Sequence, residues 1–320
     1  MATSLLPKHT SDYNDDGLSE DVDDGLGEEV DSAVQPIISL VIANVGGPSV
    51  GPGTADKRKK GIAEFLKEFQ PNIVLLQEFS WSGITGSAWR NVTIPEKYEY
   101  TGNNEASILF DKNEFIVEFP GQKELQSLLD EMIRKVQLPI GFTPLSRMCI
   151  RIIQTKGVPD MKFLCVSWHG RRKGKMTELI MELKNLLIFI ETFSNNKDLP
   201  FIIAGDFNIS LEEAVKLVQS PHVIYKYQPL RREGGKIIDF FIGSELLPLD
   251  KMSAIDWEKV DSSIDALKIF DHDPIYAQIG RTLPKKIPDP STSKQKSAQQ
   301  PLSSRVKKQT GKTRSRKASV

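Results

Sequence analysis

The amino-acid sequence predicts an α/β fold in which two packed β-sheets carry helices on their outer sides. Between residues 36 and 280, short apolar runs rich in β-branched residues alternate with segments of helical periodicity. The predicted strands outnumber the predicted helices and occur in mixed order, and this pattern favours two stacked sheets. No internal repeat is visible, and a chain of 320 residues is long enough to bury one large core.

The predicted strands are short apolar runs. The run Ile37-Ile-Ser-Leu-Val-Ile-Ala43 is nearly continuous and β-branched, as expected of a strand buried on both faces. Gly157 and Pro159-Asp160 predict a turn between two neighbouring strands. Further strands are predicted at residues 73–77, 107–110, 148–154, 162–168, 201–204, 237–242 and 275–279.

Two helices follow from apolar residues spaced i, i+3, i+4 and i+7. Thr54 or Asp56 caps the first helix, whose apolar face is Ile62, Phe65, Leu66 and Phe69, and Pro71-Asn72 ends it. The second helix is predicted from Met176 to Phe193, with its apolar face at Leu179, Ile180, Leu183, Leu186, Leu187 and Ile190.

Strongly charged segments flank this middle part. Residues 1–35 contain ten acidic residues against one lysine, and residues 281–320 contain twelve Lys and Arg against one aspartate. Both segments are poor in aromatic residues, so we expect both to be disordered and residues 36–280 to form the folded domain. The basic tail is expected to bind nucleic acid, other polyanions or import receptors, or else to act as a loosely binding solubilising tail.

The sequence shows neither a membrane span nor a secretory signal, because no long apolar run is present and residues 1–12 lack an apolar core. Cys149 and Cys165 lie in apolar strand-like runs and are predicted to be buried and unpaired. We therefore expect a nuclear or cytoplasmic protein that is not secreted.

Polar residues stand at the ends of the predicted strands, where α/β proteins gather functional groups. A single Asp or Asn at such a place is usually a turn or cap residue, but here acids, amides and imidazoles recur strand after strand. Crowded carboxylates repel unless a cation is present, and oxygen ligands point to Mg²⁺, with Mn²⁺ as a substitute. The residues concerned are Asn44, Glu78, His169, Asp206, Asn208, Asp239, Asp271 and His272.

These residues lie in motifs that resemble, in order, those of the DNase I-like endonuclease/exonuclease/phosphatase superfamily, over roughly residues 37–279. The motifs are Asn44-Val-Gly-Gly47, Leu75-Leu-Gln-Glu78, Ser167-Trp-His169, Ala204-Gly-Asp-Phe-Asn208, Ile238-Asp-Phe-Phe241 and Asp271-His-Asp-Pro274. The resemblance implies a four-layer α/β sandwich of two mixed sheets flanked by helices, with a catalytic groove along the top of both sheets.

The resemblance also implies roles. Glu78 is expected to hold the metal with Asn44 and, through outer contacts, Asp271. Asp206 would orient or deprotonate water and Asn208 would fix the phosphate. His272 would contact the phosphate, its ring held by Asp239, and His169 would contact the phosphate or assist the leaving group.

The resemblance implies an acidic or aromatic residue near the third strand. Glu105 or Asn104 could fill that place, although Ala106-Ser107 replaces the glycines usual there, and the sequence leaves the choice open. Arg147 resembles a groove arginine, although a solvent-facing structural role fits it nearly as well. Trp81 and Trp89 are candidates for stacking on bases, and core packing is an equally common role for tryptophan.

The substrate is predicted less sharply than the chemistry. Inositol-phosphatase and apurinic-endonuclease signatures are absent, whereas Arg171, Arg172, Lys173 and Lys175 form a basic loop directly beyond His169. Such a loop suits a nucleic-acid backbone, or is simply a solvated loop. The prediction is a nuclease acting on DNA or RNA. The alternatives are a phosphatase or phosphodiesterase for an inositol, lipid or other small phosphate, and an inactive binding module.

Overall fold

The computed structural model describes residues 38–46, 54–79, 94–103, 105–157, 161–219, 222–225, 236–255 and 270–279, and every structural statement below concerns these residues. One sheet contains β1 (Ile38–Asn44), β2 (Ile73–Gln77), β3 (Tyr98–Gly102), β4 (Ala106–Asp111), β11 (Leu249–Ala254) and β12 (Ile275–Ile279). The other contains β5 (Phe115–Glu118), β6 (Met148–Thr155), β7 (Lys162–His169), β8 (Phe201–Asp206), β9 (His222–Tyr225) and β10 (Asp239–Ser244).

Each sheet is mixed, with one parallel pair among antiparallel neighbours. The strand orders are β11-β12-β1-β2-β4-β3 and β5-β6-β7-β8-β10-β9. The parallel pairs are β1–β2 and β7–β8. A helix connects each pair: α1 (Thr54–Phe69) links β1 to β2, and α3 (Met176–Lys197) links β7 to β8. Parallel neighbours need such a crossover, so the helices are placed on the outer faces.

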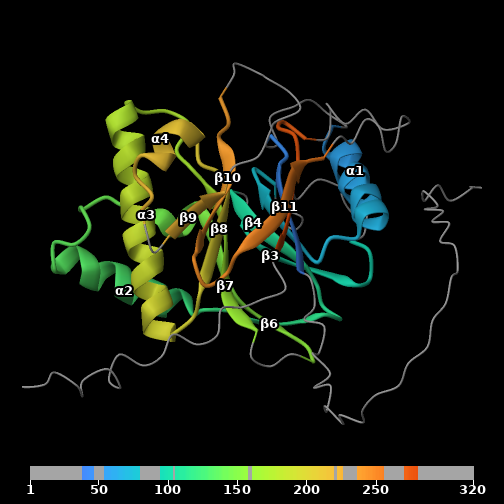
Figure 1. The fold of residues 1–320 in the computed structure, drawn as a ribbon, viewed down its shortest axis with the longest axis horizontal. Helices are drawn as coiled ribbons and strands as arrows, with labels where there is room; N and C mark the ends of the chain where they lie inside the picture. The colour runs from blue at the N-terminus through green and yellow to red at the C-terminus, as the bar shows by residue number, and fades with distance from the viewer. Residues whose placement is uncertain are drawn as a thin grey trace, which may run out of the picture. The chain divides into compact units, whose positions relative to one another are not determined.

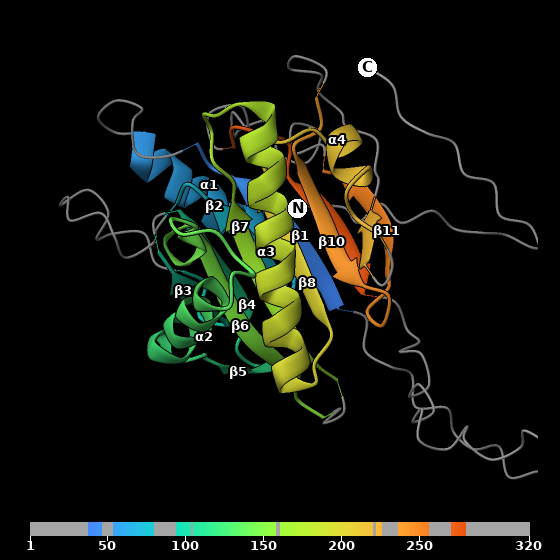
Figure 2. The same ribbon diagram turned by 90° about the vertical axis from the view of Figure 1, so that its left-hand side faces the viewer.

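The layers follow from the alternation of side chains along the strands. In β8, Ile202 and Ala204 face the core between the two sheets, whereas Phe201 and Ile203 pack on the helix side. Helix α1 covers the outer face of the first sheet, and α2 (Gln122–Arg134) and α3 cover the second (Figure 1). Figure 2 shows α3 lying across the second sheet. The fold is therefore a four-layer sandwich.

The predicted strands and helices are all present, with ends shifted by a few residues. The strand predicted at 237–242 begins at Asp239, and the second predicted helix continues to Lys197. The sequence analysis did not assign α2, the short α4 (Leu211–Val215), the 3₁₀ turn η2 (Pro144–Ser146), or the strands β3, β5, β9 and β11. These four strands are the edges of the two sheets.

The cysteine prediction is confirmed: Cys149 and Cys165 are both free and buried. Burial raises the pKa of the Cys149 thiol to about 11, which leaves it protonated near neutral pH. Within the described part of the chain, no helix has the length and apolar character needed to cross a bilayer. The predicted boundaries at 35/36 and 280/281, together with Trp81 and Trp89, lie outside the described residues and stay predictions.

Candidate active site

The predicted site residues meet at one edge of the sandwich. Strand register sets them side by side, because Asp206 pairs with both His169 and Asp239 in the second sheet. In the first sheet, Asn44 pairs with Gln77, the residue before Glu78. These strand ends therefore form one continuous polar edge.

A buried hydrogen bond joins the two sheets at this edge. Asn44 Nδ2 donates to Asp206 Oδ2 at 2.9 Å, and both side chains are almost fully buried. Asn44 Oδ1 accepts from the backbone N–H of Gly46 at 2.8 Å, which fixes the orientation of the amide. The backbone N–H of Asp271 donates to the Asn44 carbonyl at 2.9 Å, so Asp271 is placed beside it.

Asp206 is the most strongly perturbed carboxyl group of the site. Burial raises its pKa to about 7, the charge of Asp239 adds to the rise, and His272 opposes it. The backbone N–H of Asn208 donates to Asp206 Oδ1 at 2.8 Å and holds the carboxyl group in place. A carboxyl group with this pKa can accept and return a proton near neutral pH.

Asn208 closes the loop behind Asp206. Its backbone has a positive φ of 53°, which asparagine tolerates better than most residues. Its Nδ2 donates to the Gly170 carbonyl at 3.0 Å, which occupies one of its two amide protons. Gly170 approaches this loop so closely that an added Cβ would lie 2.2 Å from the Phe207 carbonyl oxygen. The glycine after His169 is thus required by packing.

His272 and Asp239 form the pair that the resemblance implies. His272 Nδ1 lies 2.7 Å from Asp239 Oδ2, and Nε2 lies 4.0 Å from Asp271 Oδ2. Burial alone would lower the pKa of His272. The hydrogen bond and charge of Asp239, helped by Asp206 and Asp271, outweigh burial and raise that pKa to about 9. The imidazole is therefore mainly protonated at neutral pH.

His169 lies between two glutamates. Its Nδ1 is 2.8 Å from Glu105 Oε2, and its Nε2 is 3.4 Å from Glu78 Oε1. Glu78 adopts a positive φ of 54°, and its backbone N–H donates to the Glu105 carbonyl at 3.0 Å. Glu105 therefore lies beside both Glu78 and His169, whereas Asn104, the other candidate, lies outside the described residues.

The donor set at this edge suits a hard divalent cation. Among the described residues, ligand atoms of Glu78, His169 and Asp206 lie within 4.8 Å of one another, and so do those of Asp206, Asp239 and His272. Carboxylate and amide oxygens are the ligands that Mg²⁺ prefers. Burial is the main cause of the raised pKa of Asp206 and the charge of Asp239 adds to it, and a cation here would favour the charged carboxylate against both.

Arg58, on α1, was missed by the sequence analysis. It stands in the run Lys57-Arg-Lys-Lys60, which is typical of a solvated helix face, yet it is 8% exposed. Burial lowers its pKa, and the charges of Asp271 and Glu78 oppose that effect. One signal was available: Arg58 precedes Ile62 by four residues and so shares the face that packs on the sheet.

The predicted substrate-binding residues fall into two groups. The Arg147 side chain donates through Nε to the His169 carbonyl at 2.8 Å and through its NH2 group to the Gly170 carbonyl, so it braces the end of β7. Arg171 is tied to α3, because its backbone N–H donates to Glu182 Oε2 at 3.1 Å and its Nε lies 3.7 Å from Glu182 Oε1. The remaining three cations of the loop, Arg172, Lys173 and Lys175, are exposed.

Two stacked mixed sheets with acids, amides and histidines gathered at one edge define the fold of the DNase I-like class. The chain belongs to the endonuclease/exonuclease/phosphatase family, which it matches over residues 42–256. This confirms both the resemblance and the fold predicted from the sequence. A search of curated protein sequences finds no match.

Solved structures share the fold at low sequence identity. TDP2 from D. rerio, complexed with a single-strand DNA product, is 18% identical at a TM-score of 0.52, covering 76% of this chain and 99% of its own. The human Nocturnin catalytic domain with bound sulfate is 16% identical at 0.55, covering 77% and 94%. The mannosyl-6-phosphatase Bt3783 of Bacteroides thetaiotaomicron is 14% identical at 0.55, covering 76% and 100%.

Proposed function

We propose that this protein is a divalent-metal-dependent phosphodiesterase that hydrolyses phosphodiester bonds of DNA or RNA. The observation that carries the proposal is the meeting of Glu78, Asp206 and the His272–Asp239 pair at one edge of the sandwich. A structural role alone would not require the buried Asp206 and Asp239 to lie together with the half-buried Glu78, because crowding like charges away from water is unfavourable.

The proposed chemistry assigns a separate step to each residue according to its pKa and contacts. Asp206, with a pKa near 7, accepts the proton of the attacking water, and the Asn44 amide and the Asn208 N–H hold its carboxyl group still. His272, with a pKa near 9, presents a cation to the phosphate oxygens. The ring of His169 contacts Glu105 on one side and Glu78 on the other, and these contacts fix its orientation. We assign it the contact with the phosphate or the leaving group.

A bound Mg²⁺ ion, or Mn²⁺ in its place, would neutralise phosphate oxygens and stabilise the leaving oxyanion. Glu78 is the proposed principal ligand, with Asn44 and Asp271 beside it. Asn44 Oδ1 already accepts from Gly46 and its Nδ2 binds Asp206, so the main contribution of Asn44 is to orient that carboxylate.

The basic loop after β7 supports a nucleic-acid substrate. Arg172, Lys173 and Lys175 are exposed and lie between His169 and the N-terminus of α3. Phosphate contacts from Lys and Arg dominate the affinity of proteins for nucleic acids, and a helix N-terminus also favours anions. The fold of TDP2, solved with a single-strand DNA product, accommodates such a substrate.

A small phosphate ester is the second candidate substrate. The mannosyl-6-phosphatase Bt3783 shares the fold at a TM-score equal to that of Nocturnin, so the fold itself does not select a polymer. The exposed cations of the basic loop favour the polymer, because a small phosphate needs no contacts along an extended backbone.

The test is a substrate screen with the full chain. Plasmid DNA, single-stranded RNA, inositol phosphates and mannose 6-phosphate are incubated with Mg²⁺, with Mn²⁺ or with EDTA. We expect cleavage of DNA or RNA that EDTA abolishes. Hydrolysis of the small phosphates alone would replace the nuclease proposal, and no metal-dependent hydrolysis of any substrate would reject the enzyme.

Substitutions at the site should separate chemistry from folding. Asp206→Asn and His272→Ala are each expected to lower turnover by roughly 10²-fold or more, the usual effect of losing an acid/base group. Asp250→Asn, an exposed aspartate on β11, is the matched control and should keep full activity. Normal activity in Asp206→Asn, with an unchanged melting temperature, would refute the assigned role.

A further inference from the structure

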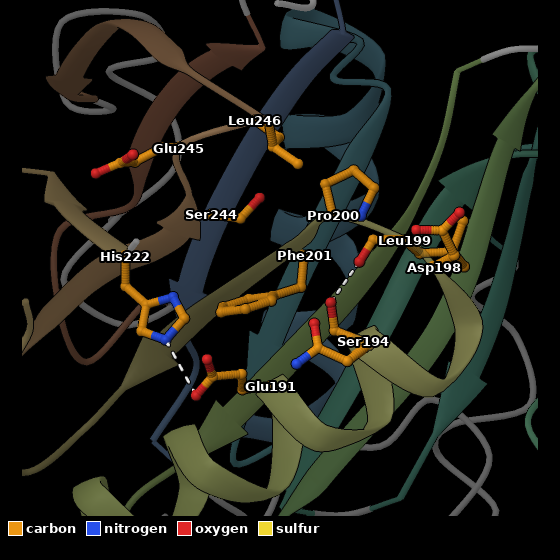
Figure 3. Close-up of a pocket in the computed structure, with 11 residues that line it drawn as sticks. Glu191, Ser194, Asp198, Leu199, Pro200, Phe201, His222, Ser244, Glu245 and Leu246 are labelled. Atoms are coloured by element: carbon orange, nitrogen blue, oxygen red, sulfur yellow. Dashed lines mark hydrogen bonds and ion pairs between the residues drawn. The ribbon is translucent and has the colours of Figure 1, made fainter. Parts of the chain in front are cut away.

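A pocket with a mostly apolar lining and a few polar side chains lies at the end of the second sheet opposite the candidate active site. The pocket has a volume of about 230 Å³ and is formed by the C-terminal turn of α3, the start of β8, the start of β9 and the turn after β10 (Figure 3). Asp206 and Asp239, at the other ends of β8 and β10, belong to the active site. The two sites therefore share strands but lie at opposite ends of them.

Two buried polar atoms at this pocket lack hydrogen-bond partners within the described structure. They are His222 Nδ1 and Ser244 Oγ, and their residues are register partners across β9 and β10. The His222 side chain is only 10% exposed, and its other ring nitrogen lies 3.6 Å from Glu191 Oε2. An unsatisfied buried polar group is destabilising, and such groups at a pocket indicate a missing partner.

The pocket is electronegative. Glu191, Asp198 and Glu245 line it, and the described lining contains no lysine or arginine. The C-terminus of α3 adds partial negative charge from the helix dipole. The basic residue of the last turn of α3, Lys197, is engaged by Glu124 on α2 at 2.5 Å. A cation is thus the charge this pocket favours.

The lining also has an apolar part that suits the stem of a long basic side chain. Leu199, Pro200 and Leu246 line the pocket beside Phe201, whose ring centroid lies 5.2 Å from that of His222 (Figure 3). Lysine and arginine bury their methylene stems on apolar surface and place the charge at the polar end. The described lining offers both surfaces in one pocket.

We propose that this pocket binds lysine or arginine side chains of the basic segment 281–320 of the same chain. That segment carries twelve Lys and Arg against one aspartate. The segment follows β12, whose last residue, Ile279, pairs with Leu249 on β11. Leu249 comes three residues after Leu246, which lines the pocket together with Glu245.

The reach of the segment fits this arrangement. Forty residues span up to roughly 130 Å when extended, far more than needed to reach a pocket near the end of β12. A tethered cation has an effective concentration of order mM, so even weak ion pairs are populated. Binding there holds the basic segment away from the opposite end of the strands, where the active site lies.

Zero-length carbodiimide cross-linking of the full chain tests the proposal, because it couples only carboxylates and lysines that touch. At low salt we expect Glu191, Asp198 and Glu245 to couple to lysines of 281–320. Glu99 on β3 is the reference, since it is exposed and forms no ion pair with the described residues, whereas Glu131 already pairs with Lys135. Coupling at the pocket should exceed coupling at Glu99 by about threefold or more, as for a partly exposed ion pair.

Two variants separate a pocket from diffuse attraction. Ser244→Ala keeps every charge and removes one orphaned hydrogen-bonding atom, so coupling should fall by about fivefold, the usual effect of one hydrogen bond. Ser253→Ala, on exposed β11, is its control and should change nothing. Glu191→Gln should reduce coupling at Asp198 and Glu245, whereas Glu99→Gln should not, with melting temperatures confirming the fold of all variants.

Three results would overturn the proposal. The first is coupling spread equally over pocket and reference carboxylates. The second is an absence of coupling to residues 281–320. The third is coupling only between different copies of the chain, which a mixture of ¹⁵N-labelled and unlabelled protein reveals. An unchanged cross-linking yield between the pocket carboxylates and residues 281–320 in Ser244→Ala would also reject the pocket as the binding site.

Discussion

The His272–Asp239 pair makes a prediction that can be measured without substrate or metal. In the metal-free protein the pKa of His272 is about 9, against an ordinary value of 6.5. Asp239 provides the largest raising effects, through its hydrogen bond and its charge, while burial acts in the opposite direction. Asp239→Asn should therefore return the pKa of His272 to about 6.5 or below.

The same pair contributes to folding stability in a defined pH window. Because the pKa of His272 is raised in the folded state, its contribution is fully present below pH 6.5 and is lost as pH rises through about 9. At roughly 1.4 kcal/mol per pKa unit, the contribution is about 3 kcal/mol. Wild-type unfolding free energy should fall by this order between those pH values, and Asp239→Asn should lose most of that dependence.

Proton NMR of the histidine ring in EDTA measures the pKa, and denaturant unfolding at several pH values measures the stability. The sequence contains only four histidines, so the His272 signal can be assigned by substitution. Asp271→Asn is the matched control, because Asp271 lies 4.0 Å from the ring whereas Asp239 lies 2.7 Å from it. A pKa that stays near 9 in Asp239→Asn, or falls further in Asp271→Asn, would refute the reasoning.

Three further predictions concern the loop, the fold and the second histidine. The double variant Lys173→Ala, Lys175→Ala should bind nucleic acid more weakly, and the slope of log affinity against log salt concentration should become shallower by about 2. Fluorescence anisotropy measures both quantities, and an unchanged slope would show that the loop does not contact the substrate. Gly205→Ala should lower the free energy of unfolding by about 3 kcal/mol in denaturant unfolding, because φ of Gly205 is +146° and the new Cβ would lie 2.0 Å from the Trp168 carbonyl oxygen. Near-native stability of this variant would contradict the close packing of Gly205 against β7. Glu105→Gln should lower turnover, because a neutral amide holds the His169 ring less firmly than the carboxylate at 2.8 Å does, and unchanged kinetics would remove Glu105 from the proposed site.

The sequence predicted the interior of the fold well and its edges poorly. Central strands such as β2 and β8 are buried on both faces, so their residues form continuous apolar runs. The four strands that were not assigned are edge strands, which pair on one side only and keep polar residues. Strand β3, for example, reads Tyr-Glu-Tyr-Thr-Gly, with its glutamate exposed. Edge strands are defined by the neighbour they join, and that neighbour is not visible locally in the sequence.

The site was predictable wherever a residue ends a central strand. Asn44, Asp206 and His169 stand at such ends, so the strand pattern located them before any contact was known. The Glu105–His169 contact joins residues 64 positions apart on different sheets, which no local pattern specifies. Arg58 was hidden in a basic run because charge alone does not say which helix face is buried.

The direction of α3 links the two ends of the molecule electrostatically. Strands β7 and β8 are parallel, so the helix between them runs antiparallel to both. Its N-terminus therefore follows the basic loop at the catalytic end, and its C-terminus joins Glu191 and Asp198 at the pocket end. A helix N-terminus favours anions and a C-terminus favours cations. The same crossover that builds the second sheet thus places the positive end of the helix near the proposed phosphate site and the negative end at the pocket proposed to bind basic side chains, and ionic strength should weaken both proposed interactions together.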